Sequence, residues 1–112
     1  MKQAVLALTG VLMRELILDG TNWTNSDDVY DAFFRAVGAP EWHGRNLDAL
    51  NDSIANGSIN EVEVPYRLII TNYELIGNGA KKMTDDFVDL IHEIEERGCP
   101  VEIRLVDSRE KV

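Results

Sequence analysis

The chain has 112 residues, 45% of them hydrophobic and 28% charged, which predicts one globular domain over residues 1–112 and excludes a disordered chain. Its 20 acidic and 11 basic residues give a net charge of −9. A surface of this sign disfavours direct binding of nucleic acid or of an anionic membrane and favours a basic protein partner, although acidity that only aids solubility is the alternative. The single cysteine, Cys99, excludes an internal disulfide and is typical of a reducing cytoplasm, where we expect a buried structural thiol.

Residues 1–13 form an N-terminal extension with an apolar run from Ala4 to Met13. The run is too short to span a bilayer. Only Lys2 precedes it as a basic residue, and no small-x-small cleavage motif follows, so we do not expect a secretion signal. We expect an additional strand or a short helix, with a hairpin-like turn at Thr9-Gly10 as one arrangement. Such a segment also suits packing on a second copy of the chain, so we expect a monomer or a weak dimer.

Apolar periodicity predicts a first strand over Arg14–Gly20, followed by a helix over residues 27–37. Asn25 or Ser26 would cap the start of this helix, because either side chain can accept a hydrogen bond from a free amide of the first turn. Gly38 would end the helix.

The next stretch begins as a turn, because Pro40 and Gly44 bracket the aromatic pair Trp42-His43. A helix is predicted over residues 46–56, with Asn46 as its N-cap. Leu47, Leu50 and Ile54 recur at the spacing of one buried helical face.

Asp48 and Asp52 are four residues apart, so they project together on the opposite face of this helix, with Asn51 at its edge. Two like charges at this spacing repel each other. The charge of Asp48 is stabilised by its place in the first turn, near the positive end of the helix dipole, whereas Asp52 has no local stabilisation. A solvated helix face beside a core tryptophan is the alternative to a binding surface.

The remaining chain alternates strands and helices. The pattern predicts an irregular connection over residues 58–67, a central parallel strand over 67–71, a helical turn over 73–76 and a helix over 79–97 ended by Gly98. An edge strand is predicted over 100–106, because Val101, Ile103 and Leu105 alternate with Glu102 and Arg104. Strands separated by helices predict an α/β fold with a small three-stranded parallel sheet packed by helices. The outer face of the long helix is acidic, through Asp85, Asp86, Asp89, Glu93, Glu95 and Glu96.

Catalysis has little support in the sequence. His43, Asp48, Asp52 and Glu93 are the residues able to supply an acid, a base or a metal ligand, but the chain lacks H-x-x-x-H, C-x-x-C, a phosphate-binding glycine loop and a nucleophile elbow. We expect His43 to be a surface imidazole, and we expect no catalytic residue, no cofactor and no metal. A metal-dependent hydrolase built from Asp48, Asp52 and His43 is the enzymatic alternative.

The run from Pro40 to Asp52 resembles the signature of the barstar family, which comprises intracellular inhibitors of the bacterial ribonuclease barnase. That signature is Pro-Glu-aromatic-aromatic-Gly running into Asn-Leu-Asp-Ala-Leu-x-Asp. Asn78-Gly79-Ala80 and Gly98-Cys99 match as well, and the similarity covers roughly residues 14–106. The resemblance implies a barstar-like fold of three-layer type and an inhibitor rather than an enzyme.

The resemblance also implies that the acidic helix and its preceding turn block the active site of a nuclease. Asp52 would occupy the pocket for substrate phosphate, Asp48 would support it with polar contacts, Trp42 would pack on the catalytic region, and Glu93 would pair with an arginine of the nuclease. The predicted partner-binding residues are Trp42, His43, Gly44, Asn46, Asp48, Asn51, Asp52 and Glu93.

Two departures from the family pattern lie in this set. His43 stands where the family has a second tyrosine, and Asn51 replaces a tryptophan, so the resemblance leaves open a partner other than barnase. We therefore expect a cytoplasmic bacterial immunity protein against a basic ribonuclease toxin. A barstar-fold adaptor for a basic protein that is not a nuclease is the alternative.

Overall fold

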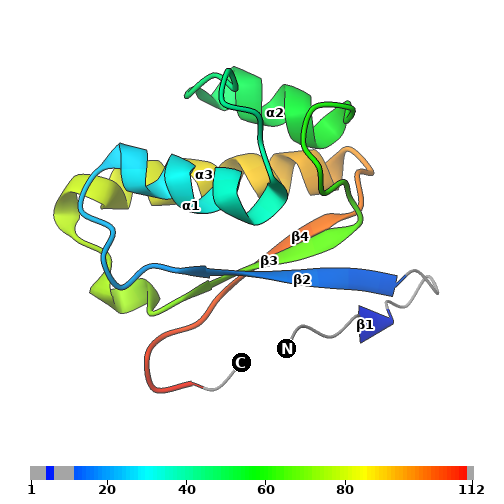
Figure 1. Cartoon of the computed structure of the whole chain (residues 1–112). Coiled ribbons are helices and arrows are strands. Elements are labelled where there is room, and N and C mark those ends of the chain that lie inside the picture. Colours follow the sequence, from blue (N-terminus) through cyan, green and yellow to red (C-terminus); the bar gives the residue numbers. More distant parts are fainter. Residues whose placement is uncertain (1–4, 7–11, 111–112) are drawn as a thin grey trace.

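The computed structural model of the chain describes residues 5–6 and 12–110. Figure 1 shows a twisted sheet with the helices gathered over one of its faces. In chain order the elements are β1 (Val5–Leu6), β2 (Leu12–Asp19), α1 (Ser26–Val37), α2 (Leu47–Ala55), β3 (Tyr66–Thr71), the 3-10 turn η1 (Tyr73–Leu75), α3 (Asn78–Glu96) and β4 (Val101–Leu105). The helices and strands predicted between residues 14 and 106 are therefore confirmed, with ends that differ by at most two residues.

The strands lie in the order β1-β2-β3-β4, which places β3 in the centre and β4 at one edge, as predicted. The pairs β2–β3 and β3–β4 are parallel, with Leu68 opposite Leu16 on one side and opposite Ile103 on the other. The predicted three-stranded parallel sheet is thus confirmed. β1 adds a short antiparallel strand through Val5, which pairs with Met13, so the N-terminal extension does contain a strand. The turn expected at Thr9-Gly10 lies outside the described residues.

The helices form two layers on the same face of the sheet. Because β2, β3 and β4 are neighbours in chain order, both crossover connections run in the same direction, and right-handed crossovers then place their helices on one face. α1 and α3 pack directly on the sheet, while α2 lies on their outer side and packs against α3 (Figure 1). Sheet, inner helices and outer helix make the three-layer arrangement that was predicted.

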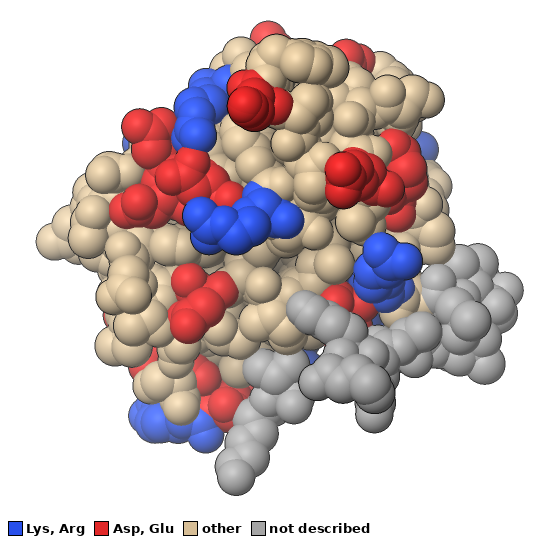
Figure 2. All heavy atoms as spheres, viewed as in Figure 1, with Lys and Arg blue, Asp and Glu red and all other residues tan. Residues whose placement is uncertain are grey.

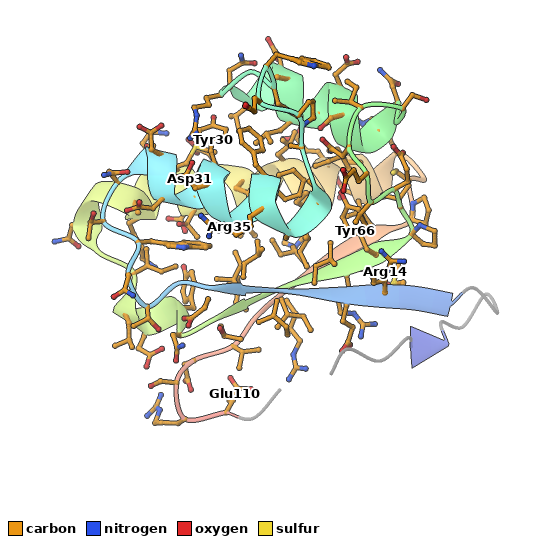
Figure 3. The ribbon with its side chains drawn as sticks, in the orientation of Figure 1. Arg14, Tyr30, Asp31, Arg35, Tyr66 and Glu110 are labelled. Carbon is orange, nitrogen blue, oxygen red and sulfur yellow. The ribbon has the colours of Figure 1, made fainter. Side chains whose placement is uncertain are left out.

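The core lies between the sheet and the inner helices. Phe33 of α1 and Phe87 of α3 meet edge to face with ring centroids 5.4 Å apart, and both side chains are fully buried. Tyr66 points from the start of β3 into the helix layer (Figure 3), and its burial raises the pKa of its phenol. The predicted core face of α3 is buried at Met83, Phe87, Ile91 and Ile94 and half-buried at Leu90.

The face of the sheet turned away from the helices carries ion pairs, although most residues of the central strand β3 are apolar. Arg67 lies between Glu15 and Glu102 on the neighbouring strands, at 3.0 Å and 2.9 Å respectively. Ile69 follows on the same face and is buried. Leu105 is exposed at the carboxyl end of the edge strand, and the next residue, Val106, is buried.

The C-terminal end of α3 has the geometry predicted for Gly98. Gly98 adopts φ 99°, a left-handed conformation that only glycine takes without strain. Its amide donates to the carbonyl of Glu95, and the amide of Cys99 donates to the carbonyl of Ile94, which satisfies the last turn of the helix. Cys99 is half-buried, and desolvation raises the pKa of its thiol. None of the helices in the described part of the chain combines the length and the apolar character needed to cross a bilayer.

Candidate partner-binding surface

The start of α2 is built as predicted, with Asn46 as its N-cap. The Asn46 side-chain oxygen accepts a hydrogen bond of 2.8 Å from the amide of Ala49, and the Asn46 backbone is extended. Gly44 lies close beneath this cap. A Cβ at Gly44 would lie 3.1 Å from the Asn46 side-chain nitrogen and 3.2 Å from the Ala49 Cβ. Both contacts are tight, so a larger residue at this position would require the Asn46 side chain or the first turn of the helix to shift by a few tenths of an ångström.

Asp48 and Asp52 both lie exposed on α2, away from the buried Leu50 and Ile54. Asp48 is the acidic residue of the first helical turn. The expectation that Asp52 lacks local stabilisation is wrong, because the side-chain amide of Asn56, one turn further along, donates to its Oδ1. This contact fixes one carboxylate oxygen and leaves Oδ2 available, since a carboxylate accepts several hydrogen bonds.

Trp42 is the most exposed large hydrophobic residue in the described part of the chain, with 73% of its surface accessible. The other tryptophan, Trp23, is 5% exposed and belongs to the core. The alternative in which Trp42 is a core residue is therefore wrong. An isolated aromatic side chain of this size at the surface, next to an acidic helix, has the properties of an interface anchor.

The prediction of a surface imidazole at His43 is wrong. His43 is only 6% exposed, and its ring packs against Phe34 of α1 with centroids 4.5 Å apart. Its Nδ1 lies 2.9 Å from the carbonyl oxygen of Gly44, and its Nε2 lies 2.9 Å from Oγ of Ser53 on α2. Because Ser53 is also buried, His43 joins the turn to the inner side of α2 rather than to solvent.

The structure brings Asp48, Asn51 and Glu93 together around one groove between α2 and α3. The groove has a volume of about 420 Å³ and is lined by Leu47, Asp48, Asn51, Asp86, Asp89, Leu90, Glu93 and Arg97. Asn51, which is half-buried, accepts a hydrogen bond from the guanidinium of Arg97. Because its lining combines the apolar Leu47 and Leu90 with carboxylates from both helices, this groove is suited to a cationic side chain with an aliphatic stem.

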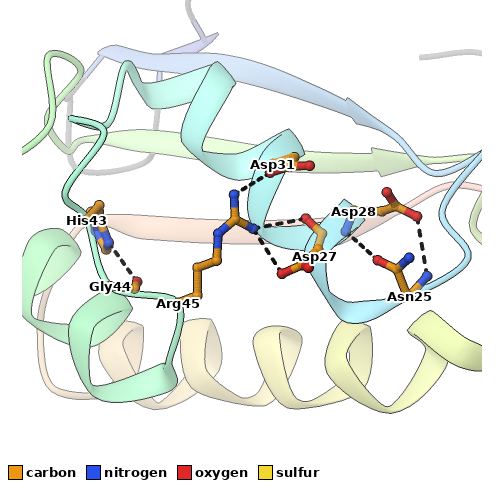
Figure 4. A network of polar contacts seen from close by, with 7 residues as sticks. All are labelled: Asn25, Asp27, Asp28, Asp31, His43, Gly44 and Arg45. Carbon is orange, nitrogen blue, oxygen red and sulfur yellow. Dashed lines mark hydrogen bonds and ion pairs between the residues drawn. The ribbon is translucent and has the colours of Figure 1, made fainter.

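Arg45 is a residue of the turn that the sequence analysis did not single out. Figure 4 shows its guanidinium turned back toward α1, where Nη1 lies 3.2 Å from Asp27 and Nη2 lies 2.5 Å from Asp31. The guanidinium carbon also lies over the rings of Tyr30 and Phe34, at 5.9 Å and 5.4 Å from their centroids. The hydrogen bond to Asp31 raises the pKa of Arg45.

The charges on the face of the molecule seen in Figure 2 are mostly acidic. Basic side chains on this face lie beside acidic ones, and over α1 the two signs are in contact. Within the described residues, no group of three His, Cys, Asp or Glu side chains is arranged to hold a metal ion. Asp48, Asp52 and His43 in particular do not converge, because the His43 ring is buried toward Ser53.

A family model described as Barstar (barnase inhibitor) matches residues 13–108. The chain belongs to the barstar family. It is also 31% identical over 84 residues to "Putative ribonuclease inhibitor YrdF" of Bacillus subtilis (strain 168), an alignment that covers 75% of this chain and 88% of that protein. The matched range contains β2 to β4 and the whole candidate surface, and the family is one of inhibitors rather than enzymes.

Proposed function

We propose that this barstar-family chain inhibits a basic bacterial ribonuclease by blocking its active site with α2 and the turn that precedes it. The observation that carries the proposal is the geometry of one surface: exposed Asp48 and Asp52 on α2, with the 73%-exposed Trp42 immediately before the helix. These three side chains present two carboxylates and one aromatic ring, and the active site of a ribonuclease is cationic because it binds phosphate.

In the proposed complex, Asp52 takes the place of a substrate phosphate. Its Oδ1 is held by Asn56, so the carboxylate is oriented before contact and its free Oδ2 accepts from an arginine or histidine of the nuclease. Asp48 adds a second acceptor on the same face. Trp42 covers the apolar part of the catalytic region, and Glu93 receives a basic side chain across the groove between α2 and α3.

Gly44 and Asn46 contribute in a different way. The Gly44 backbone packs close to the start of α2, and the Asn46 side chain caps that helix. Together these contacts set the position of Trp42 relative to the start of α2. His43 is proposed as a residue that holds this surface together from within, since its burial keeps its ring from the partner. A chain of this kind, made by a bacterium alongside a ribonuclease toxin, would act as a cytoplasmic immunity protein.

The test uses barnase as the probe, with RNA hydrolysis and complex formation measured together. We expect stoichiometric loss of nuclease activity and an association rate that falls as salt is raised, because encounter between opposite charges is screened. Asp52→Ala should weaken the complex by at least about 2 kcal/mol, the scale of charged interface hot spots for which barnase and barstar are themselves the type example.

Glu96→Ala is the matched control, because it removes the same charge from an exposed position of α3 outside the groove. Its effect should be limited to a small change in the association rate. Equal effects of Asp52→Ala and Glu96→Ala would contradict phosphate mimicry. Binding of barnase without loss of its activity would instead favour the adaptor.

A further inference from the structure

Arg45 occupies an unusual place for a cation in an acidic inhibitor. It lies three residues after the exposed Trp42 and directly before the helix cap Asn46, inside the segment that the proposed function brings against a basic partner. We call residues 40–46 the Trp42 turn. An unpaired cation in this turn would repel that partner, whereas the Arg45 side chain, which is 44% exposed, is paired with two carboxylates.

The guanidinium is directed away from the proposed contact surface and onto α1. Its two terminal nitrogens bind different carboxylates, of Asp27 and Asp31, which are one helical turn apart. The cation also lies over the rings of Tyr30 and Phe34. Two carboxylates neutralise the guanidinium, and the planar fork matches this arrangement in a way that a lysine would not.

A second attachment holds the other side of the same turn. The His43 ring is buried between Phe34 of α1 and Ser53 of α2, and the His43 amide donates to the carbonyl of Pro40 at 3.0 Å. The Trp42 turn is thus fixed to α1 through Arg45 and to α2 through His43. Trp42 directly precedes the first of these two points, and its own side chain makes little contact with the rest of the protein.

We propose that Arg45 is a positioning residue that holds the Trp42 turn in its binding conformation before the partner arrives. This extends the proposed function, on which its effect on affinity rests. A turn ordered in advance loses less conformational entropy on binding, so the complex is tighter than one made by a mobile turn. The attachment itself is a property of the free protein and is measurable without any partner.

Charge and positioning predict opposite outcomes for Arg45→Ala. The substitution removes a positive charge from a chain of net charge −9, so general electrostatics predicts faster and tighter binding of a basic protein. Loss of positioning predicts weaker binding. Arg35→Ala is the matched control, because Arg35 is exposed on the same helix α1 (Figure 3) and forms no ion pair with the described residues.

The first measurement is amide hydrogen exchange of the free full-length chain. The probe is the amide of His43, which donates to the carbonyl of Pro40 within the Trp42 turn, and in Arg45→Ala we expect it to exchange about five- to tenfold faster, the combined effect of a paired guanidinium and its cation–π contacts. Amides of β3 and α3 should be unchanged, which also verifies the fold. Asp31→Asn removes the acceptor instead of the cation and should give a smaller change of the same kind. Unchanged exchange in the turn in both variants would overturn the proposal.

The second measurement is binding of barnase to the same variants. We expect Arg45→Ala to raise the dissociation constant about five- to tenfold, Arg45→Lys to recover only part of this loss, and Arg35→Ala to leave binding equal or slightly tighter. Binding of Arg45→Ala that is as tight as that of the wild type, or tighter, overturns the positioning role. If the wild-type chain does not bind barnase, the inhibitor proposal fails for this nuclease, while the exchange contrast still decides whether Arg45 holds the turn.

Discussion

Replacing Trp42 by alanine should remove much of the binding energy of the proposed complex while leaving the fold almost intact. A tryptophan side chain presents up to about 250 Å² of surface. Because 73% of the residue is exposed, roughly 180 Å² remains for a partner to cover. At about 25 cal/mol per Å², complete burial would contribute at most ~4.5 kcal/mol. Ordering and imperfect packing reduce this value, so we expect a loss of about 2–4 kcal/mol.

The same accounting gives a small effect on folding. The part of Trp42 that is already covered is roughly 70 Å², and at the same coefficient its loss should lower the free energy of unfolding by at most about 1.8 kcal/mol. Trp23 is the opposite case, because it is only 5% exposed and lies in the core. Trp23→Phe should lower the free energy of unfolding by about 1–3 kcal/mol and leave the affinity unchanged in the folded fraction.

The assay pairs isothermal titration of barnase with equilibrium unfolding in urea, applied to both tryptophan variants. Two results would refute the reasoning. One is a Trp42→Ala variant that binds barnase as tightly as the wild type. The other is a loss of unfolding free energy in Trp42→Ala of about 3 kcal/mol or more, the scale for truncating a buried tryptophan, since the ring would then be part of the folding core.

Two further predictions concern the support of the surface and the core beneath it. Asn46→Ala should lower the free energy of unfolding by about 1 kcal/mol in urea denaturation, because the amide of Ala49 loses its acceptor. Asn46→Asp keeps an acceptor and should leave the free energy of unfolding almost unchanged. Equal losses in the two variants would contradict the capping role. Burial raises the pKa of Tyr66, so above about pH 10 the unfolded chain releases a proton that the native chain retains, and stability should fall by up to ~1.4 kcal/mol per pH unit. This loss is absent below pH 10, and Tyr66→Phe should show a correspondingly flatter profile between pH 9 and pH 11.

Much of the fold followed from local patterns in the sequence. Apolar periodicity gave the helices and strands, the cap Asn46 was found from its side-chain chemistry, and Gly98 marked the end of α3. These features depend on interactions within a few residues, which a sequence displays directly. The central position of β3 was also predictable, because a short strand with an apolar run on both sides of its pleat belongs inside a parallel sheet.

The parts of the site that sequence reasoning missed depend on contacts between distant residues. Ser53 lies ten positions after His43, and nothing in the local sequence shows that the two side chains meet in the interior. Arg45 reaches carboxylates of α1 that precede it by 14 and 18 positions. The Asn56 contact to Asp52 has an i to i+4 spacing, so that spacing was the one available signal.

The position of α2 in the outer layer has a consequence for the evolution of the family. The helix that carries Asp48 and Asp52 packs on α3, and while its Leu50 and Ile54 join the core, both aspartates lie exposed on its outer side. Under the proposed function, we expect substitutions at these exposed positions to change recognition with little effect on stability. Such a scaffold would be able to follow a partner whose surface changes.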